Sequence, residues 1–125
     1  MSKEKHPTVY LEDILNAIGK IERYTKGMSK DEFISNELVI DGVIRNLEII
    51  GEATKKLPKS FRQQYPQVPW KKIAGMRDVL IHDYSGIDIE VVWDTIKEKL
   101  PEFKKQVQMI LTEVDSDQEL EAPEP

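Results

Sequence analysis

Residues 36–57, NELVIDGVIRNLEIIGEATKKL, decide the fold, because their apolar side chains recur at the spacing of a helix and not of a strand. The inner face of this long helix is expected to hold Leu38, Val39, Gly42, Val43, Leu47, Ile50 and Ala53. Pro58 then closes the helix. Gly42 and Gly51 lie inside it, where each glycine costs about 1 kcal/mol relative to alanine. We therefore expect another helix to cross closely at these positions.

The segment before this helix has the same apolar periodicity. It predicts a first helix over about residues 8–26, which Gly27 is placed to end. Ser29, followed three residues later by Glu32, is typical of a capping box and predicts a short helical turn around Phe33. His6 is expected to lie in a frayed N-terminus.

The segment after the long helix is a connector followed by a third helix. Residues 58–69, PKSFRQQYPQVP, form the connector, with a turn of helix expected at 60–64. Pro69 suits the first position of the third helix, where its missing N–H is not needed. This helix should fade before Gly86.

A last helix is predicted to start after Asp88, which is a good N-cap, with Ile87 and Val92 able to staple across the cap. Its apolar positions continue to about residue 114. Pro101 should kink it, because proline removes a backbone donor and clashes with the preceding turn.

The pattern as a whole predicts an all-α fold, an up-down bundle of four main helices over residues 1–114. The remaining residues 115–125, DSDQELEAPEP, are expected to be an acidic, disordered tail. This tail holds five of the 23 acidic side chains and no Lys or Arg. Without it the body has 18 acidic and 18 basic side chains, so the net charge of −5 comes from the tail and does not exclude an RNA-binding surface on the body.

Composition narrows the class of protein. A chain of 125 residues fits one domain, and 39% hydrophobic with 33% charged residues suits a globular protein. Cysteine is absent, which excludes disulfides, thiolate metal sites and a cysteine nucleophile. The sequence has no signal-peptide pattern and no apolar run long enough to span a bilayer, so we expect a cytoplasmic protein.

The densest polar cluster in an apolar helix is Arg77-Asp78-Val79-Leu80-Ile81-His82-Asp83-Tyr84. On an ideal helix Arg77 and Tyr84 fall within about 20° of each other, whereas His82 points about 140° away from Arg77. Asp78 lies one turn before His82 and could orient its ring. A straight helix therefore does not place Arg77 and His82 on one face. We expect local unwinding near His82 combined with assembly of the site across a dimer.

Two interpretations of this cluster stand side by side. Arginine matches a phosphate with its forked donors, and histidine suits proton transfer near neutrality, so the pair fits metal-independent cleavage of RNA through attack by the 2′-hydroxyl. Alternatively, Arg77 pairs with Asp78 or Asp83 at a helix end, while His82 caps the last carbonyls of the helix. Residue chemistry alone leaves both open.

The sequence around this cluster resembles the HepT-like branch of the HEPN superfamily. Arg77, His82 and Tyr84 match its R-x4-H-x-Y motif. The motif alone is weak, but its surroundings are more specific. The family pattern is carried, in order, by IRNLEIIGEATKKLP (44–58), VPWKKIAGMRDVLIHDYSGIDIEVVW (68–93) and LPEF (100–103). The resemblance covers roughly residues 8–112.

The resemblance implies a toxin of a type II-like toxin–antitoxin pair, an endoribonuclease that works as a homodimer without metal or other cofactor. Arg77 and His82 take the catalytic positions. The implied partner is a minimal nucleotidyltransferase antitoxin, which transfers AMP from ATP to the motif tyrosine, here Tyr84. One departure is Asp78, where an amide is common; a carboxylate there would raise the pKa of a nearby His82 but weaken phosphate binding.

Several other residues have a structural and a functional interpretation. Glu52 matches a family feature and could support the cleft, although a structural salt bridge is favoured. Trp70 and Trp93 could stack on bases, but core packing is favoured. Lys71 and Lys72 could form part of an RNA-facing rim or be ordinary exposed lysines. Two distant histidines do not provide a metal site.

Two alternatives to the ribonuclease use the same sequence. One is a non-catalytic HEPN module that binds and orients a nucleotidyltransferase, and the more remote one is a purely structural helical dimer. Histidine-dependent cleavage of RNA by the isolated chain would discard the first. The second predicts that changes at His82 affect only stability.

Overall fold

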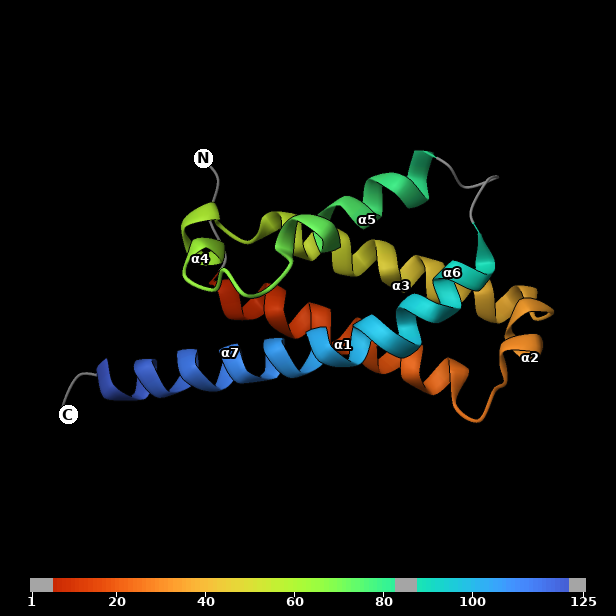
Figure 1. Cartoon of the computed structure of the whole chain (residues 1–125). Helices are drawn as coiled ribbons and strands as arrows, with labels where there is room; N and C mark the ends of the chain where they lie inside the picture. Colours follow the sequence, from red (N-terminus) through yellow and green to blue (C-terminus); the bar gives the residue numbers. More distant parts are fainter. Residues whose placement is uncertain (1–5, 83–87, 122–125) are drawn as a thin grey trace.

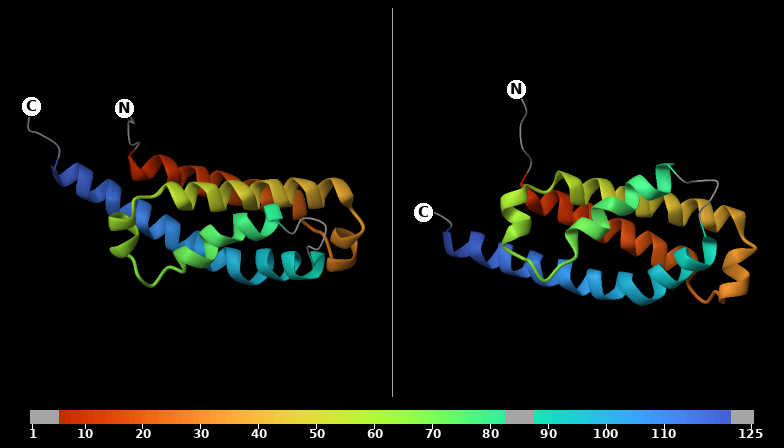
Figure 2. Two further views of the ribbon diagram at one scale, coloured as in Figure 1. Left: turned by 90° about the horizontal axis from the view of Figure 1, so that it is seen from above. Right: turned by 45° about the horizontal axis from the view of Figure 1, so that its top comes forward.

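The computed structural model describes residues 6–82 and 88–121, with side chains at 6–76 and 88–114. Four long helices form the body: α1 (Pro7–Thr25), α3 (Glu37–Lys56), α5 (Trp70–His82) and α7 (Leu100–Glu121). Between them lie α2 (Lys30–Ile34), α4 (Lys59–Gln63), α6 (Ile89–Asp94) and the π-helical turn η2 (Thr95–Lys99). Helix α3 packs on both α1 and α5, and α7 runs along the other side of α1 (Figures 1 and 2). The predicted all-α, HEPN-like bundle is confirmed.

The core lies where α1, α3 and α7 meet. Its largest fully buried side chains come from these three helices, from α2 and from the residue that follows α3: Phe33, Phe103, Leu11, Ile14, Ile18, Ile21, Leu47, Ile50, Leu57, Ile110, Val43 and Val107. Lys104 on α7 adds a polar tie, with its Nζ 3.0 Å from Oε1 of Glu22 on α1. Within the described ranges, no helix is both long enough and apolar enough to cross a membrane.

Helix α1 begins and ends with identifiable caps. His6 is its N-cap, and Nδ1 of its ring accepts a hydrogen bond from the Thr8 N–H at 3.2 Å. The prediction that His6 lies in a frayed terminus was therefore wrong, because the ring replaces one of the missing helix partners. After α1, Gly27 has a φ of +76°, a left-handed conformation that reverses the chain toward α2. This confirms the predicted end.

The predicted capping box opens α2. The Ser29 hydroxyl oxygen accepts from the Glu32 N–H at 3.1 Å, and Glu32 Oε1 accepts from the Ser29 N–H at 2.9 Å. The pKa of Glu32 is held below its ordinary value of 4.5 by two hydrogen bonds with Ser29. The bond with the Ser29 backbone has the larger effect, and the bond with its side chain has the smaller one. The cap fixes the direction in which Phe33 enters the core, where its ring lies 5.1 Å from that of Trp93.

The close helix crossing predicted from Gly42 is present. A Cβ added to Gly42 would lie 3.1 Å from two ring carbons of Tyr24, at the end of α1. Glycine therefore lets α3 approach this ring. Gly51, the other glycine of the helix, is buried. Asn36 caps α3 by accepting from the Val39 N–H at 3.1 Å, and the helix ends just before Leu57 and Pro58, as expected.

The connector folds as predicted, with one shift at its end. Helix α4 occupies 59–63, one residue before the expected turn, and Phe61 anchors it in the core. Helix α5 begins at Trp70 and not at Pro69. The Pro69 carbonyl accepts from the Ile73 N–H at 3.1 Å, so proline stands just outside the helix as its cap residue. The predicted first position was therefore wrong by one residue.

The last predicted helix is one continuous helical run in three parts. Asp88 caps it as expected, accepting from the backbone N–H groups of Glu90 and Val91 at 3.0 and 3.3 Å. Ile87, the other half of the predicted staple, lies outside the described residues. The run continues to Glu121, past the expected end near residue 114.

Pro101 affects this helix through the turn before it. In η2 the Leu100 N–H donates to the Thr95 carbonyl, one residue further back than in an α-helix. A proline at 101 has no N–H to offer the Lys97 carbonyl and crowds it, and the wider π-helical turn accommodates this ring. The irregularity predicted at Pro101 thus lies in the five residues 95–99.

Candidate active site on helix α5

Helix α5 carries the first part of the sequence motif, from Arg77 to His82, in its last two turns. Its backbone runs from Trp70 to His82, so Arg77, Asp78 and His82 all belong to one helix that packs on α3. The side chains of these three residues, and Tyr84 entirely, lie outside the described residues. The expected unwinding near His82 and the roles of the four residues therefore stay predictions.

The first half of α5 is held firmly against the bundle. Trp70 is buried, and its Nε1–H donates to the Tyr65 carbonyl at 3.0 Å. The rings of Trp70 and Phe103 are nearly perpendicular, with their centres 6.1 Å apart. Ala74 is buried as well, while Ile73 and Met76 pack against the core from its border. This half-helix is a rigid support for the motif residues that follow it.

The two tryptophans are core residues, as favoured from the sequence. Trp70 is 6% exposed and Trp93 is 9% exposed, which leaves neither ring free to stack on a base. Lys97 lies over the Trp93 ring, with its Nζ 4.6 Å from the ring centre. At this distance the ammonium group is within the range of a cation–π contact with the indole.

Glu52, the supporting residue predicted on α3, forms the type of contact that the sequence favoured. Its Oε1 lies 3.9 Å from Nζ of Lys56, one helical turn later. Both side chains are substantially exposed, so this ion pair contributes little to stability. A role for Glu52 in the cleft remains a proposal.

A groove of about 450 Å³ separates α5 from the start of α7, immediately before the motif. Its floor is apolar, formed by Ile73, Met76, Leu100 and Phe103, and charged side chains stand at its rim: Lys72, Lys99 and Glu102. This groove was not predicted from the sequence, since its walls come from helices that lie far apart along the chain.

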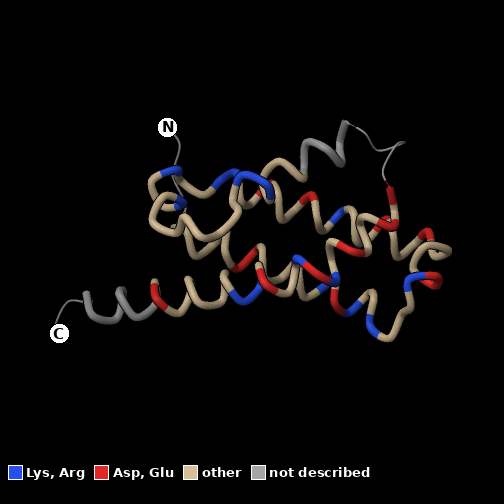
Figure 3. The backbone as a smooth tube through the Cα atoms, in the orientation of Figure 1, with Lys and Arg blue, Asp and Glu red and all other residues tan. Residues whose placement is uncertain are grey.

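Charged residues are unevenly distributed along the backbone, with Lys and Arg positions gathered on α4 and the start of α5 (Figure 3). Lys71 and Lys72, the two lysines considered for an RNA-facing rim, are both exposed at the start of α5. Together with Lys59 and Arg62 on α4, which were not singled out from the sequence, these lysines line a different groove, between α4 and the start of α5. Across the part of the chain that the structure describes, no group of three or more His, Cys, Asp or Glu could hold a metal ion.

The arrangement of long helices, with an R-x4-H segment on α5, is that of an all-α bundle of the HEPN type. The model of the HepT-like ribonuclease family matches residues 14–110. The chain therefore belongs to the HepT-like family.

Curated relatives from several organisms match between 76% and 88% of the chain. A protein of Caldanaerobacter subterraneus named as an inferred RNase is 47% identical over 107 residues, which are 86% of this chain and 96% of that protein. A similarly named protein of Methanocaldococcus jannaschii is 46% identical over 110 residues, 88% of this chain and 91% of the relative. A Thermococcus cleftensis protein, "Probable ribonuclease HepT", is 46% identical over 95 residues, 76% and 86% of the two chains. No solved structure matches the chain.

Proposed function

We propose that this protein is a metal-independent endoribonuclease and the toxin of a toxin–antitoxin pair, acting in the cytoplasm as a homodimer. Its membership of the HepT-like family carries the proposal, together with the R-x4-H-x-Y segment from Arg77 to Tyr84. Relatives at 46–47% identity named as ribonucleases support the same activity.

The proposed reaction uses only the RNA and two side chains. The 2′-hydroxyl oxygen forms a bond to the adjacent phosphorus, and the bond from phosphorus to the 5′-oxygen breaks. The proton leaves the 2′-hydroxyl and the 5′-oxygen gains one, so the products carry a 2′,3′-cyclic phosphate and a 5′-hydroxyl. His82 moves these protons, and Arg77 stabilises the charge on the phosphorane. Asp78 and Glu52 are proposed as supporting residues.

We assign control of the enzyme to Tyr84. A nucleotidyltransferase partner would join its phenol oxygen to the α-phosphorus of ATP, with pyrophosphate as leaving group. The added AMP brings negative charge and bulk to the segment that follows His82, where the RNA backbone must lie. The RNA is thereby excluded and the toxin is neutralised.

Cleavage of a labelled RNA in the presence of EDTA tests the catalytic proposal. His82→Ala and Arg77→Ala should each lower the rate by about 10²–10⁴-fold, because each removes a group needed only in the transition state. Arg77→Lys is the matched control for charge without the forked donors, and circular dichroism checks the fold of every variant. A folded parent protein, free of AMP, that cuts no RNA would leave the non-catalytic HEPN module as the better assignment.

Intact mass after co-expression with a nucleotidyltransferase tests the control proposal. The parent chain should gain the mass of one or more adenylyl groups, and Tyr84→Phe should gain none. An equal gain in the Tyr84→Phe variant would place the modification on another residue.

A further inference from the structure

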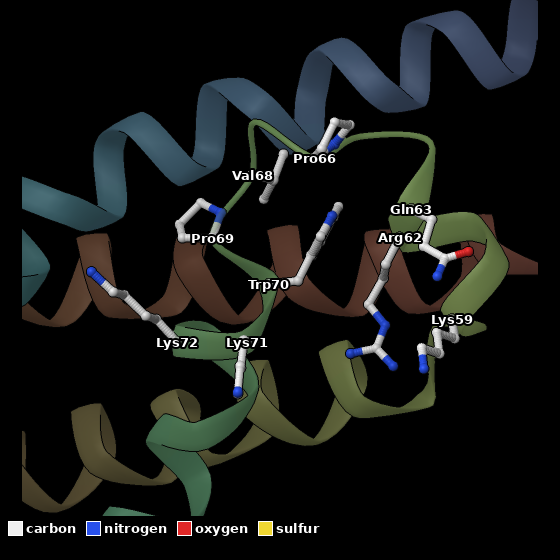
Figure 4. A pocket seen from close by; sticks show the side chains of 9 residues that line it. All are labelled: Lys59, Arg62, Gln63, Pro66, Val68, Pro69, Trp70, Lys71 and Lys72. Atoms are coloured by element: carbon white, nitrogen blue, oxygen red, sulfur yellow. The ribbon is translucent and has the colours of Figure 1, made fainter.

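A second groove lies between α4 and the start of α5, and its lining is basic (Figure 4). It has a volume of about 940 Å³, and its charged side chains are Lys59, Arg62, Lys71 and Lys72, with no acidic residue in the lining. The ends of Lys59 and Arg62 lie side by side, whereas Lys72 is turned away from them (Figure 4). The groove therefore presents several positive charges to whatever occupies it.

These four cations contrast with three lysines elsewhere in the described part of the chain, which are held in ion pairs. Lys30, Lys56 and Lys104 each form an ion pair with Glu or Asp. Among the residues with described side chains, none pairs with Lys59, Arg62, Lys71 or Lys72. The Nε of Arg62 is also buried there without a hydrogen-bond partner. Like charges held together in this way are complementary to an anion.

The groove leads along α5 toward the motif. On an ideal helix, position 82 lies about 16 Å beyond position 71 and is rotated from it by only about 20°. Gly75 lies on the same face between them, and a Cβ added there would meet nothing within 4 Å. The chain thus leaves this face of α5 uncovered beside Gly75, and an extended polyanion could follow it from Lys71 to the helix position of His82.

We propose that the groove between α4 and α5 binds the phosphate backbone of single-stranded RNA on one side of the cleaved bond. This inference rests on the proposed ribonuclease function and names where its substrate is held. Lys59, Arg62 and Lys71 contact successive phosphates, and the strand then crosses Gly75 toward the reacting centre. A second copy of the chain fits the groove less well, because a symmetric contact between two such patches would bring cations against cations.

Fluorescence anisotropy with a labelled 2′-O-methyl oligouridylate, which cannot be cleaved, measures this binding over a range of NaCl concentrations. The variants are Lys59→Gln with Lys71→Gln, and the same pair with Arg62→Gln. The matched control is Lys20→Gln with Lys26→Gln, two exposed lysines nearer the α2 end of the bundle. Sedimentation equilibrium gives the oligomeric state of each.

The double variant should bind about tenfold more weakly than the parent, and its slope of log affinity against log salt should fall by about 1.4. The slope of the triple variant should fall by about 2.1, and the control pair should leave it unchanged. Equal slopes for all proteins, or an equal loss in the control pair, would overturn the proposal. So would a change of oligomeric state confined to the groove variants, which would assign the groove to a second copy.

Cleavage of the corresponding unmodified RNA separates this inference from the function on which it rests. If the parent protein cleaves RNA but the groove variants keep the parent's salt slope, the ribonuclease proposal stands and the groove proposal is wrong. If the proteins bind RNA with the predicted salt slopes but the parent cleaves nothing, the groove proposal stands and the ribonuclease proposal is wrong.

Discussion

The two ends of the bundle treat their charged side chains in opposite ways. At the α2–α6 end, Lys30 reaches across to Glu90 and Asp94 at 3.5 and 3.6 Å, so its charge joins two helices. At the α4–α5 end, Lys59 and Lys71 lie in a groove without acidic lining. At the first end the positive charge is paired between two helices, and at the second it is available for a ligand.

The same contrast is present in the backbone and the packing. The α2–α6 end has a complete capping box at Ser29 and Glu32, and Phe33 there is fully buried. At the other end α4 has no side-chain cap, and Phe61 is 9% exposed. The comparison indicates that the α4–α5 end gives up local stabilisation where we propose that it binds RNA.

The largest effect is expected from the two aromatic anchors. Phe33→Ala should destabilise the fold by about 3–5 kcal/mol, because it removes a fully buried ring packed on Trp93. Phe61→Ala should cost less, since that ring is less completely buried and packs on the half-buried Tyr65. Urea denaturation of the two variants measures both free energies of unfolding. Equal losses of unfolding free energy in the two variants would contradict the inferred difference in packing between the two ends.

Two glycine substitutions should change the free energy of unfolding by a smaller amount. Gly75→Ala should raise the free energy of unfolding by about 1 kcal/mol, because the new methyl group enters open space in a helix interior. Gly42→Ala should gain less, since its methyl group would press on the Tyr24 ring at 3.1 Å. Thermal unfolding of both variants gives the comparison. A loss of stability in Gly75→Ala would mean that the face beside it is already covered.

The cations themselves should respond differently to removal. Lys30→Gln should lower the melting temperature at low salt, because it leaves Glu90 and Asp94 without their partner. Partial burial lowers the pKa of Lys30, but the carboxylates of Asp94 and Glu90 outweigh it and raise that pKa above 10.5.

Lys71→Gln is the matched change at the other end. It should alter stability by no more than about 0.5 kcal/mol, since it breaks no ion pair that the structure describes. Added salt should shrink the effect of Lys30→Gln. If Lys71→Gln destabilised the protein as much as Lys30→Gln does, the lysine would have a structural partner.

The smallest effect is the pH dependence of the capping box. The pKa of Glu32 is lower in the folded state than in the unfolded chain, so its stabilisation is complete above pH 4.5. It is lost as the pH falls through the lower folded pKa. The difference in urea midpoint between the parent and Glu32→Gln should therefore shrink on acidification. Glu12→Gln, on the exposed face of α1, is the charge-matched control, and a difference that grew would contradict this assignment.

Local sequence signals predicted most of the helical frame. The Ser29–Glu32 box, the Asp88 cap and the turn at Gly27 each depend on a few neighbouring residues, and each is present. The π-helical turn at 95–99 was not predicted in form, because Pro101 requires a disturbance but does not specify which backbone solution relieves it. The cap formed by His6 was missed since histidine is an uncommon N-cap residue.

The candidate site was less accessible to sequence reasoning than the frame. Arg77, His82 and Tyr84 were singled out through a family resemblance, and ideal helical geometry could only say that Arg77 and His82 point apart. The basic groove depends on tertiary structure, because Phe61 docks α4 and brings Lys59 and Arg62 beside the start of α5. The sequence signals for the groove were the adjacent Lys71 and Lys72, already considered for an RNA-facing rim, and the pair Lys59 and Arg62 on either side of Ser60 and Phe61.

The turn at Gly27 has a stereochemical consequence. Its φ of +76° belongs to the region favoured by the mirror image of a natural amino acid. A Cβ of natural chirality would meet nothing within 4 Å, so the strain of an L residue here comes from its backbone alone. An L-alanine at this position would be strained by about 1–2 kcal/mol. A D-alanine, introduced by chemical ligation, would adopt the same φ without strain and would restrict the unfolded chain more than glycine does. At this turn, opposite chirality at one α-carbon therefore separates a destabilising methyl group from a stabilising one.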